Sequence, residues 1–174
     1  MQKVIRELWI LVFLHNITGG FFESREEAAY NPNSQHKYSI LSKISDRDKF
    51  NGKFEFKLIY PELNGFNHWR QSNNPIVEED DLTKAKATGY EPIKITWSGS
   101  NWGGLLRTKY HYSSECLPTL IDGSIGVKEW WFSIGRVKNC TGRVSSTTTF
   151  PGPNGNLVKH AELWIRTRVV SCES

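Results

Sequence analysis

The sequence has little of several features that mark common classes of protein. Its 174 residues include three cysteines and one methionine, and no Cys-x-x-Cys or His-x-x-x-His spacing occurs. Structural zinc sites depend on such spacings, so no metal site is expected. The five histidines are scattered, and no serine or cysteine lies in a recognised catalytic motif. Because nucleophilic catalysis needs a nucleophile beside an activating base, the sequence predicts a protein that is not an enzyme and uses no cofactor.

Long apolar runs and dense runs of basic residues are also missing. After residue 20 no stretch approaches the roughly 20 apolar residues that a membrane-spanning helix needs. The formal net charge is +4, from 22 basic and 18 acidic residues, and the basic residues are scattered. A nucleic-acid-binding protein concentrates them on one face or in one run. We therefore expect neither a membrane span nor a nucleic-acid partner.

The first twenty residues have the pattern of a signal peptide. Lys3 and Arg6 form a basic start, residues 8–14 form a short apolar run, and Thr18-Gly19-Gly20 offers small residues for cleavage. The same apolar run could instead be a core strand or helix. The favoured interpretation is a signal peptide at 1–20, a loose polar leader at 21–35, and a single secreted, extracellular domain at 36–174.

Cysteine usage fits that compartment. An odd count permits one disulfide and leaves one thiol free or available to link a second chain as a covalent dimer. The preferred pair is Cys116 with Cys140, because both flank the Trp130-Trp131 segment. Asn139-Cys140-Thr141 matches the glycan acceptor pattern and makes Asn139 a candidate glycosylation site, although a cysteine in the middle position weakens it.

Short alternating segments predict the fold class. Residues 53–60 and 161–169 alternate apolar and polar side chains, as half-buried strands do. We expect Phe54, Phe56, Leu58, Leu163 and Ile165 to point inward, and Lys53, Lys57, Arg166 and Arg168 to point outward. Further strands are expected at 67–71, 93–97, 105–110, 117–121 and 130–134, and a short helix, with a strand as the alternative, at 38–44. Turn signals every eight to twelve residues favour an all-β antiparallel sandwich, such as a jelly roll or a galactose-binding-like fold.

Sugar binding needs an exposed ring for stacking and polar groups for the hydroxyls. Trp69 has polar neighbours on both sides, and Trp102 follows Asn101 and precedes Gly103-Gly104, which would give a ligand close access. The candidate ligand-binding residues are Trp69, Arg70, Gln71, Asn101, Trp102 and Asp122. Asp122 is also a favoured turn residue, and each tryptophan could belong to the core instead. The acidic run 78–81 lacks the alternating spacing of a calcium loop, so we expect a solvated loop there.

Several motifs occur in a characteristic order. They are His68-Trp69-Arg70-Gln71-Ser72-Asn73-Asn74-Pro75, Trp102-Gly103-Gly104-Leu105, Leu120-Ile121-Asp122-Gly123-Ser124, Trp130-Trp131-Phe132-Ser133-Ile134-Gly135, Pro151-Gly152-Pro153 and Glu162-Leu163-Trp164. Together they resemble an extracellular module common in cnidarian and lancelet proteins, sometimes found beside fibrinogen-like or skeletal-matrix regions. The resemblance implies secretion and a non-enzymatic matrix or surface role. The chain departs from the usual pattern after Gly135.

The leading functional hypothesis is a secreted, non-catalytic, lectin-like module that binds glycans. A structural extracellular-matrix or adhesion module with protein partners is the alternative, and the odd cysteine favours it. A hydrolase ranks third, because glycoside hydrolysis needs two carboxylates facing each other across a cleft. Asp122 with Glu129 or Glu162 would be the candidate pair.

Overall fold

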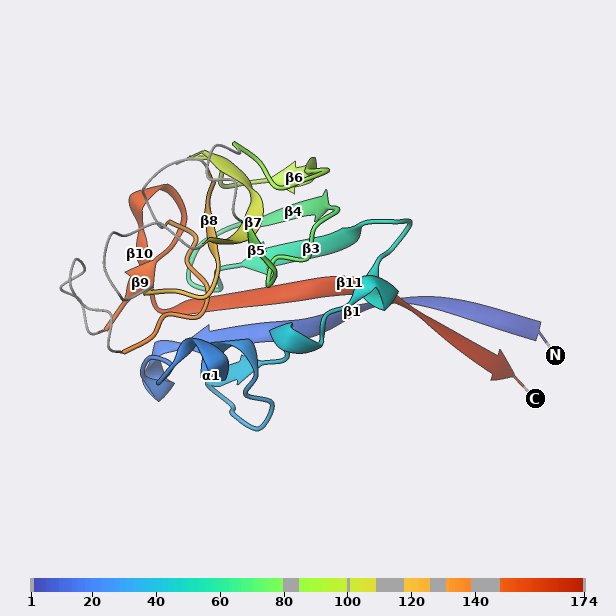
Figure 1. The fold of residues 1–174 in the computed structure, drawn as a ribbon, viewed down its shortest axis with the longest axis horizontal. Coiled ribbons are helices and arrows are strands. Elements are labelled where there is room, and N and C mark those ends of the chain that lie inside the picture. Colours follow the sequence, from blue (N-terminus) through green and yellow to red (C-terminus); the bar gives the residue numbers. More distant parts are fainter. Residues whose placement is uncertain are drawn as a thin grey trace.

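A six-stranded antiparallel sheet runs the length of the molecule (Figure 1), with strand order β2-β1-β11-β3-β4-β6. The structure is a computed structural model, and it describes residues 2–79, 85–99, 101–108, 118–125, 131–138 and 148–173. The strands of the large sheet are β1 (Gln2–Asn16), β2 (Lys37–Ser39), β3 (Phe54–Ile59), β4 (Phe66–Gln71), β6 (Glu91–Ile95) and β11 (His160–Glu173).

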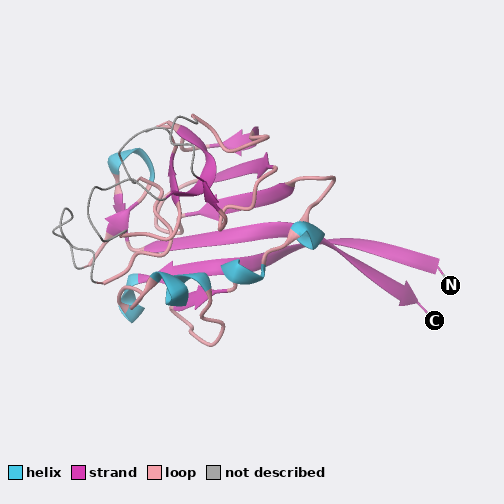
Figure 2. Ribbon diagram, viewed as in Figure 1, coloured by secondary structure: helices cyan, strands magenta, loops and turns pink. Residues whose placement is uncertain are grey.

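Smaller elements cover one face of this sheet. A three-stranded sheet has the order β5-β7-β8, and β9 pairs with β10. These strands are β5 (Glu78–Glu79), β7 (Trp102–Thr108), β8 (Asp122–Ser124), β9 (Phe150–Pro151) and β10 (Leu157–Val158). Among the described residues, helical structure is limited to α1 (Arg25–Ala29) and the single turns η1 (Ile17–Gly19), η2 (Leu41–Lys43), η3 (Asp46–Asp48) and η4 (Pro153–Gly155). Figure 2 shows how strands dominate the described chain, and the predicted all-β sandwich is confirmed.

The core lies between the large sheet and its cover. Phe54, Phe56, Leu58, Leu163 and Ile165 are all buried there, as their alternation predicts. Phe56 pairs with Ile165 on β11 and with Trp69 on β4, so inward positions of three strands meet in one row. Lys57 and Arg166 point to the opposite face. The predicted faces of β3 and β11 are therefore confirmed.

Residues 2–16 form β1, the second strand of the large sheet, which lies between β2 and β11. Its register with β11 runs from Gln2 opposite Glu173 to Asn16 opposite His160, with one bulge between Leu11 and Phe13. Val12 and Phe13 are buried in the core. The segment expected to be a removable signal is thus a core strand in this structure, which is the alternative that the sequence allows. A signal peptide and a core strand can both contain such a short apolar run, so its composition does not distinguish them.

The expected leader at 21–35 also contributes to the core. Ser24 caps α1, since its hydroxyl accepts a hydrogen bond from the backbone nitrogen of Glu27 at 3.1 Å. Phe22 and Ala28 are buried. The segment 38–44 is the end of strand β2 followed by the single turn η2, so it contains both a strand and one helical turn.

The region after residue 116 differs most from expectation. Asp122 is not a hairpin turn residue but lies in β8, which pairs with β7. The two strands expected at 117–121 and 130–134 meet only in an isolated bridge between Ile121 and Ile134, as far as the chain is described there. Cys116, Asn139 and Cys140 lie outside the described residues, so the predicted disulfide and glycan site stay predictions. Within the described ranges no helix is both long and apolar enough to cross a membrane.

Candidate functional site on the open face of the sheet

Trp69 and Trp102, the predicted stacking platforms, lie in the core. Trp69 is 0 % exposed and Trp102 is 7 % exposed, and their rings meet edge to face with centroids 4.8 Å apart. A ring that stacks on a sugar must present a face to solvent. Neither ring does so, and the prediction that these two residues bind a glycan is contradicted by their burial.

Gln71 has a structural role instead of the predicted ligand contact. Its Oε1 accepts hydrogen bonds from Nε1 of Trp69 at 2.8 Å and from the backbone nitrogen of Leu105 at 3.0 Å. Its Nε2 donates to the carbonyl oxygens of Leu105 and Asn73, both at 3.0 Å. The side-chain amide therefore links β4 to β7 in the way that a neighbouring peptide group would.

The Gly103-Gly104 pair gives close access to this amide rather than to a ligand. A Cβ at Gly104 would lie 2.9 Å from Oε1 of Gln71, and the residue has a φ of +99°, which favours glycine. A Cβ at Gly103 would lie 2.7 Å from the carbonyl oxygen of Ala85. Gly104 is therefore required by the packing of β7 on β4, and Gly103 by the packing of β7 on the loop that precedes β6.

Asp122 and Asn101 complete the predicted set, and they lie apart. Asp122 is buried, its Oδ1 accepts a hydrogen bond from the backbone nitrogen of Ser124, and Oδ2 has no partner within the described structure. Burial raises the pKa of this carboxyl well above its usual range. Asn101 is an exposed turn residue with a φ of +56°. Of the six residues, four are buried, and only Arg70 and Asn101 are partly or fully exposed.

Arg70 points away from the core, because side chains alternate along β4. It belongs to what we call the open face, the side of the large sheet opposite the core. The open face carries Glu7, Trp9 and Leu11 on β1, Glu162, Trp164, Arg166 and Arg168 on β11, Glu55 and Lys57 on β3, Phe66, His68 and Arg70 on β4, and Glu91 and Lys94 on β6. Trp9, Phe66 and Trp164 are partly exposed. The open face is the candidate site.

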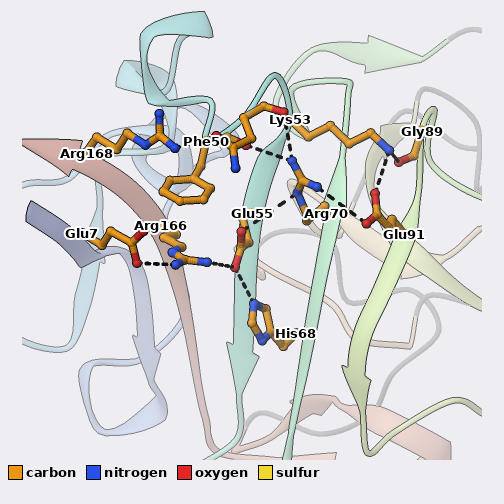
Figure 3. Close-up of polar contacts among 11 residues, drawn as sticks. Glu7, Phe50, Lys53, Glu55, His68, Arg70, Gly89, Glu91, Arg166 and Arg168 are labelled. Carbon is orange, nitrogen blue, oxygen red and sulfur yellow. Dashed lines mark hydrogen bonds and ion pairs between the residues drawn. The ribbon is translucent and has the colours of Figure 1, made fainter. Parts of the chain in front are cut away.

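Glu55 is the centre of an ionic row across the open face (Figure 3). Its Oε1 accepts hydrogen bonds from Nε2 of His68 at 2.8 Å and from Nη1 of Arg166 at 3.0 Å. Nε of Arg70 lies 4.0 Å from its other oxygen. Glu55 is 2 % exposed, so its carboxylate has little contact with solvent. These neighbouring groups balance its negative charge. Burial lowers the pKa of His68, although the bond to Glu55 acts in the other direction.

The row continues at both ends with further acids. Arg166 also pairs with Glu7, and Nη1 of Arg70 lies 3.6 Å from Glu91. Nζ of Lys53 binds the other oxygen of Glu91 at 3.0 Å. This hydrogen bond lowers the pKa of Glu91. The ionic row thus contains the three cations Lys53, Arg70 and Arg166 and the three acids Glu7, Glu55 and Glu91, and it neutralises itself.

The next row across the sheet has no acid. In the strand register Trp164 lies opposite Lys57, Lys57 opposite His68, and His68 opposite Lys94. Nζ of Lys57 lies 4.1 Å from the ring centroid of Trp9 and 5.6 Å from that of Phe66, and Nζ of Lys94 lies 5.0 Å from the same Phe66 ring. No carboxylate in the described part of the chain forms a salt bridge with either lysine. We call Lys57, His68 and Lys94 the basic row.

One loop borders the open face. Phe50 is buried between the guanidinium groups of Arg166 and Arg168, which lie 4.1 and 4.3 Å from its ring centroid. The carbonyl oxygen of Phe50 accepts a hydrogen bond from Nη2 of Arg70 at 3.0 Å. These contacts hold Arg70 and Arg166 of the ionic row, and Arg168 beside it, against the loop that contains Phe50.

The geometry offers little to a hydrolase. Asp122 lies in the core, whereas Glu162 lies on the open-face side of β11 and accepts a hydrogen bond from Nε1 of Trp164 at 2.9 Å. These two carboxylates therefore do not face each other, and Glu129 lies outside the described residues. The described ranges also contain no cluster of three or more histidine, cysteine or acidic residues that could hold a metal.

Comparison of the chain with models of known families, with curated proteins and with solved structures finds no match. The resemblance to a cnidarian and lancelet extracellular module stays a prediction. The sequence identifies Lys57 as an outward residue, but it misses the basic row. Lys57, His68 and Lys94 come from three different strands, and only the register of those strands brings them together.

Proposed function

We propose that the chain is a non-catalytic extracellular recognition module that binds glycans through the open face. The observation that carries the proposal is the mixture of partly exposed rings and cationic donors on a side of the sheet that no described strand covers. Trp9, Phe66 and Trp164 offer apolar surface to the CH groups of a sugar. Lys57, Lys94 and Arg168 beside them offer donors to its oxygens.

The extracellular location is part of this proposal. Three cysteines and the acceptor pattern at Asn139 support it. The apolar segment 8–14 suits export, but β1 is needed for the core, because Val12 and Phe13 are buried. An exported form with this fold would therefore retain residues 2–16.

A glycan array probed with the full chain tests the function. Trp9→Ala and Trp164→Ala should each weaken binding about tenfold, the effect of losing roughly 1.4 kcal/mol of contact energy. Tyr30→Ala is the matched control, since Tyr30 is an exposed aromatic residue at the end of α1. Absence of binding to every glycan, or equal binding by all three variants, would refute the proposal.

The alternative of an adhesion module with protein partners has support from a different part of the molecule. The N-terminal part of β1 and the C-terminal part of β11 project together beyond the rest of the sheet (Figure 1). Leu8 and Ile10 are exposed near this projection, and the backbone of Cys172 lies in it opposite Lys3. Non-reducing electrophoresis of the chain and of Cys172→Ser distinguishes this candidate. A dimer band that disappears in the variant would favour it over glycan binding alone.

A further inference from the structure

The two rows of the open face differ in their charge balance. The ionic row pairs three cations with three acids, all within the contacts already described. The basic row places Lys57 and Lys94 on either side of His68, and no carboxylate of the described chain pairs with them. Positive charge therefore remains on the basic row, and also on Arg168 beside the ionic row, whose guanidinium binds the amide oxygen of Asn51 and lies over Phe50.

The two lysines of the basic row converge on a single ring. Their ammonium groups lie 5.6 and 5.0 Å from the centroid of Phe66. Each cation is attracted by the negative face of an aromatic ring, but two like charges near one ring repel each other. An anion bound beside Phe66 would remove this repulsion and give each ammonium group an acceptor.

His68 lies between the two lysines and does not itself bind such an anion through Nε2. Its Nε2 is bound to Glu55, and burial lowers its pKa, so the ring contributes little positive charge of its own near neutral pH. The ring packs edge to face on Trp9, with centroids 5.3 Å apart. The ring therefore separates the two lysines, and its hydrogen bond to Glu55 holds that carboxylate on the side of the ionic row.

We infer that the ligand of the open face is an acidic glycan, whose sulfate or carboxylate group binds between Lys57 and Lys94 while a sugar ring lies against Phe66. The inference rests on the proposed function and adds the charge of the ligand. The oxygens of sulfate and carboxylate groups accept hydrogen bonds from ammonium groups. Phe66 is partly exposed beside both lysines, so one glycan residue can use the ring and the charge together.

Binding of the full chain to dextran sulfate, hyaluronan and unmodified dextran tests the inference and separates its two sources of charge. Dextran sulfate carries sulfate groups, hyaluronan carries carboxylates, and dextran is neutral. We expect at least one acidic polymer to bind more than tenfold more tightly than dextran, with affinity that falls as salt rises. Duplex DNA is included as a polyanion of another class.

The decisive variant is Lys57→Ala combined with Lys94→Ala. Its matched control is Lys43→Ala combined with Lys86→Ala, which removes the same charge from lysines that lie over Tyr30 and Tyr90. We expect the first pair to lose about tenfold or more in affinity for the acidic polymer and to show a weaker salt dependence, because two counter-ion contacts are lost. Lys57→Gln with Lys94→Gln keeps most of each stem packed on its ring and should give the same loss.

Each remaining outcome overturns the inference in a recognisable way. Equal, salt-independent binding of dextran and the acidic polymers would leave the proposed function standing and remove its acidic ligand. Equal losses in the two lysine pairs would show that only net charge matters. Binding of duplex DNA as tightly as the acidic polymer would point to nucleic acid instead. No binding to any polymer or array glycan would refute both the inference and the proposed function.

Discussion

Glu55 accepts a hydrogen bond from Arg166, at 3.0 Å, across 111 positions of the chain. Glu55 is buried, whereas Arg166 is partly exposed, so removal of the carboxylate leaves three cationic or hydrogen-bonding groups without their common partner. Glu55→Gln should cost about 2 kcal/mol of unfolding free energy, less than for a fully buried ion pair because the cations reach water. Chemical denaturation measures this loss of unfolding free energy.

Glu7→Gln is the control, since Glu7 is exposed and exposed ion pairs contribute little to stability. Equal losses in the two variants would argue against a central role for Glu55.

Phe56 and Lys57 are neighbours in sequence but lie on opposite faces of β3. Phe56→Ala should cost about 3–5 kcal/mol, because it removes a fully buried ring and leaves a cavity. Lys57→Ala should stay within roughly 0.5 kcal/mol, as surface changes usually do. Denaturant midpoints of the two variants check the prediction. A larger loss for Lys57 would mean that the faces of β3 are reversed.

Gln71 should matter for stability and not for ligand binding. Gln71→Ala leaves the indole of Trp69 and both backbone groups of Leu105 without their hydrogen-bond partner. We expect a loss of about 2–3 kcal/mol, the usual cost of unsatisfied buried polar groups. Gln35→Ala makes the same chemical change at an exposed position and should be nearly neutral. Thermal unfolding of the two variants would show similar midpoints if the link between β4 and β7 were unimportant.

His15 should make the fold sensitive to acid. Burial lowers the pKa of His15 to about 4, whereas a histidine in the unfolded chain keeps the ordinary pKa of about 6.5. Between these values the unfolded state binds more protons than the folded state, so stability falls as pH falls from about 6.5 to about 4, by up to about 3 kcal/mol. His15→Gln should lose less stability than the original chain between pH 7 and pH 4.5. His36→Gln, at an exposed position, should behave like the original chain, and identical curves for all three would contradict the prediction.

Deletion of residues 1–20 should prevent folding. It removes β1, exposes the long edge of β11, and takes Val12 and Phe13 out of the core. Circular dichroism of the shortened chain should show lost strand content, and mass spectrometry of protein exported by cells should find residues 2–16 retained. A shortened chain that folds with an unchanged midpoint would show that the segment is dispensable, as the signal-peptide interpretation requires.

The sequence predicts well which residues of one strand point inward and which point outward. It predicts poorly which residues of different strands lie together on one face of the sheet. The period of two in residues 53–60 is enough to set Phe56 inward and Lys57 outward, because only one face of that strand is apolar. In β4 both faces carry rings and polar groups, so the pattern shows that Trp69 and Arg70 point in opposite directions but not which of them is covered. The cover is β7, more than thirty residues later, and its contact with Gln71 depends on long-range packing.

Contacts between distant strands also decide the position of β1 and the formation of the basic row, so local patterns predict neither. A seven-residue apolar run has the same composition in a signal peptide and in a core strand, and only the partner β11 distinguishes them. Lys57, His68 and Lys94 form a row because β3, β4 and β6 are adjacent in one register. A shift of one residue in any pair would send one of these side chains to the core.

The pairing of β1 with β11 has a consequence for how the protein is made. Strand β1 leaves the ribosome before β11 and waits for a partner at positions 160–173. The centre of the sheet closes late, so contact order is high and folding is expected to be slow. Until then the apolar positions of β1 have no permanent neighbour, and vectorial synthesis leaves them available to chaperones and to aggregation.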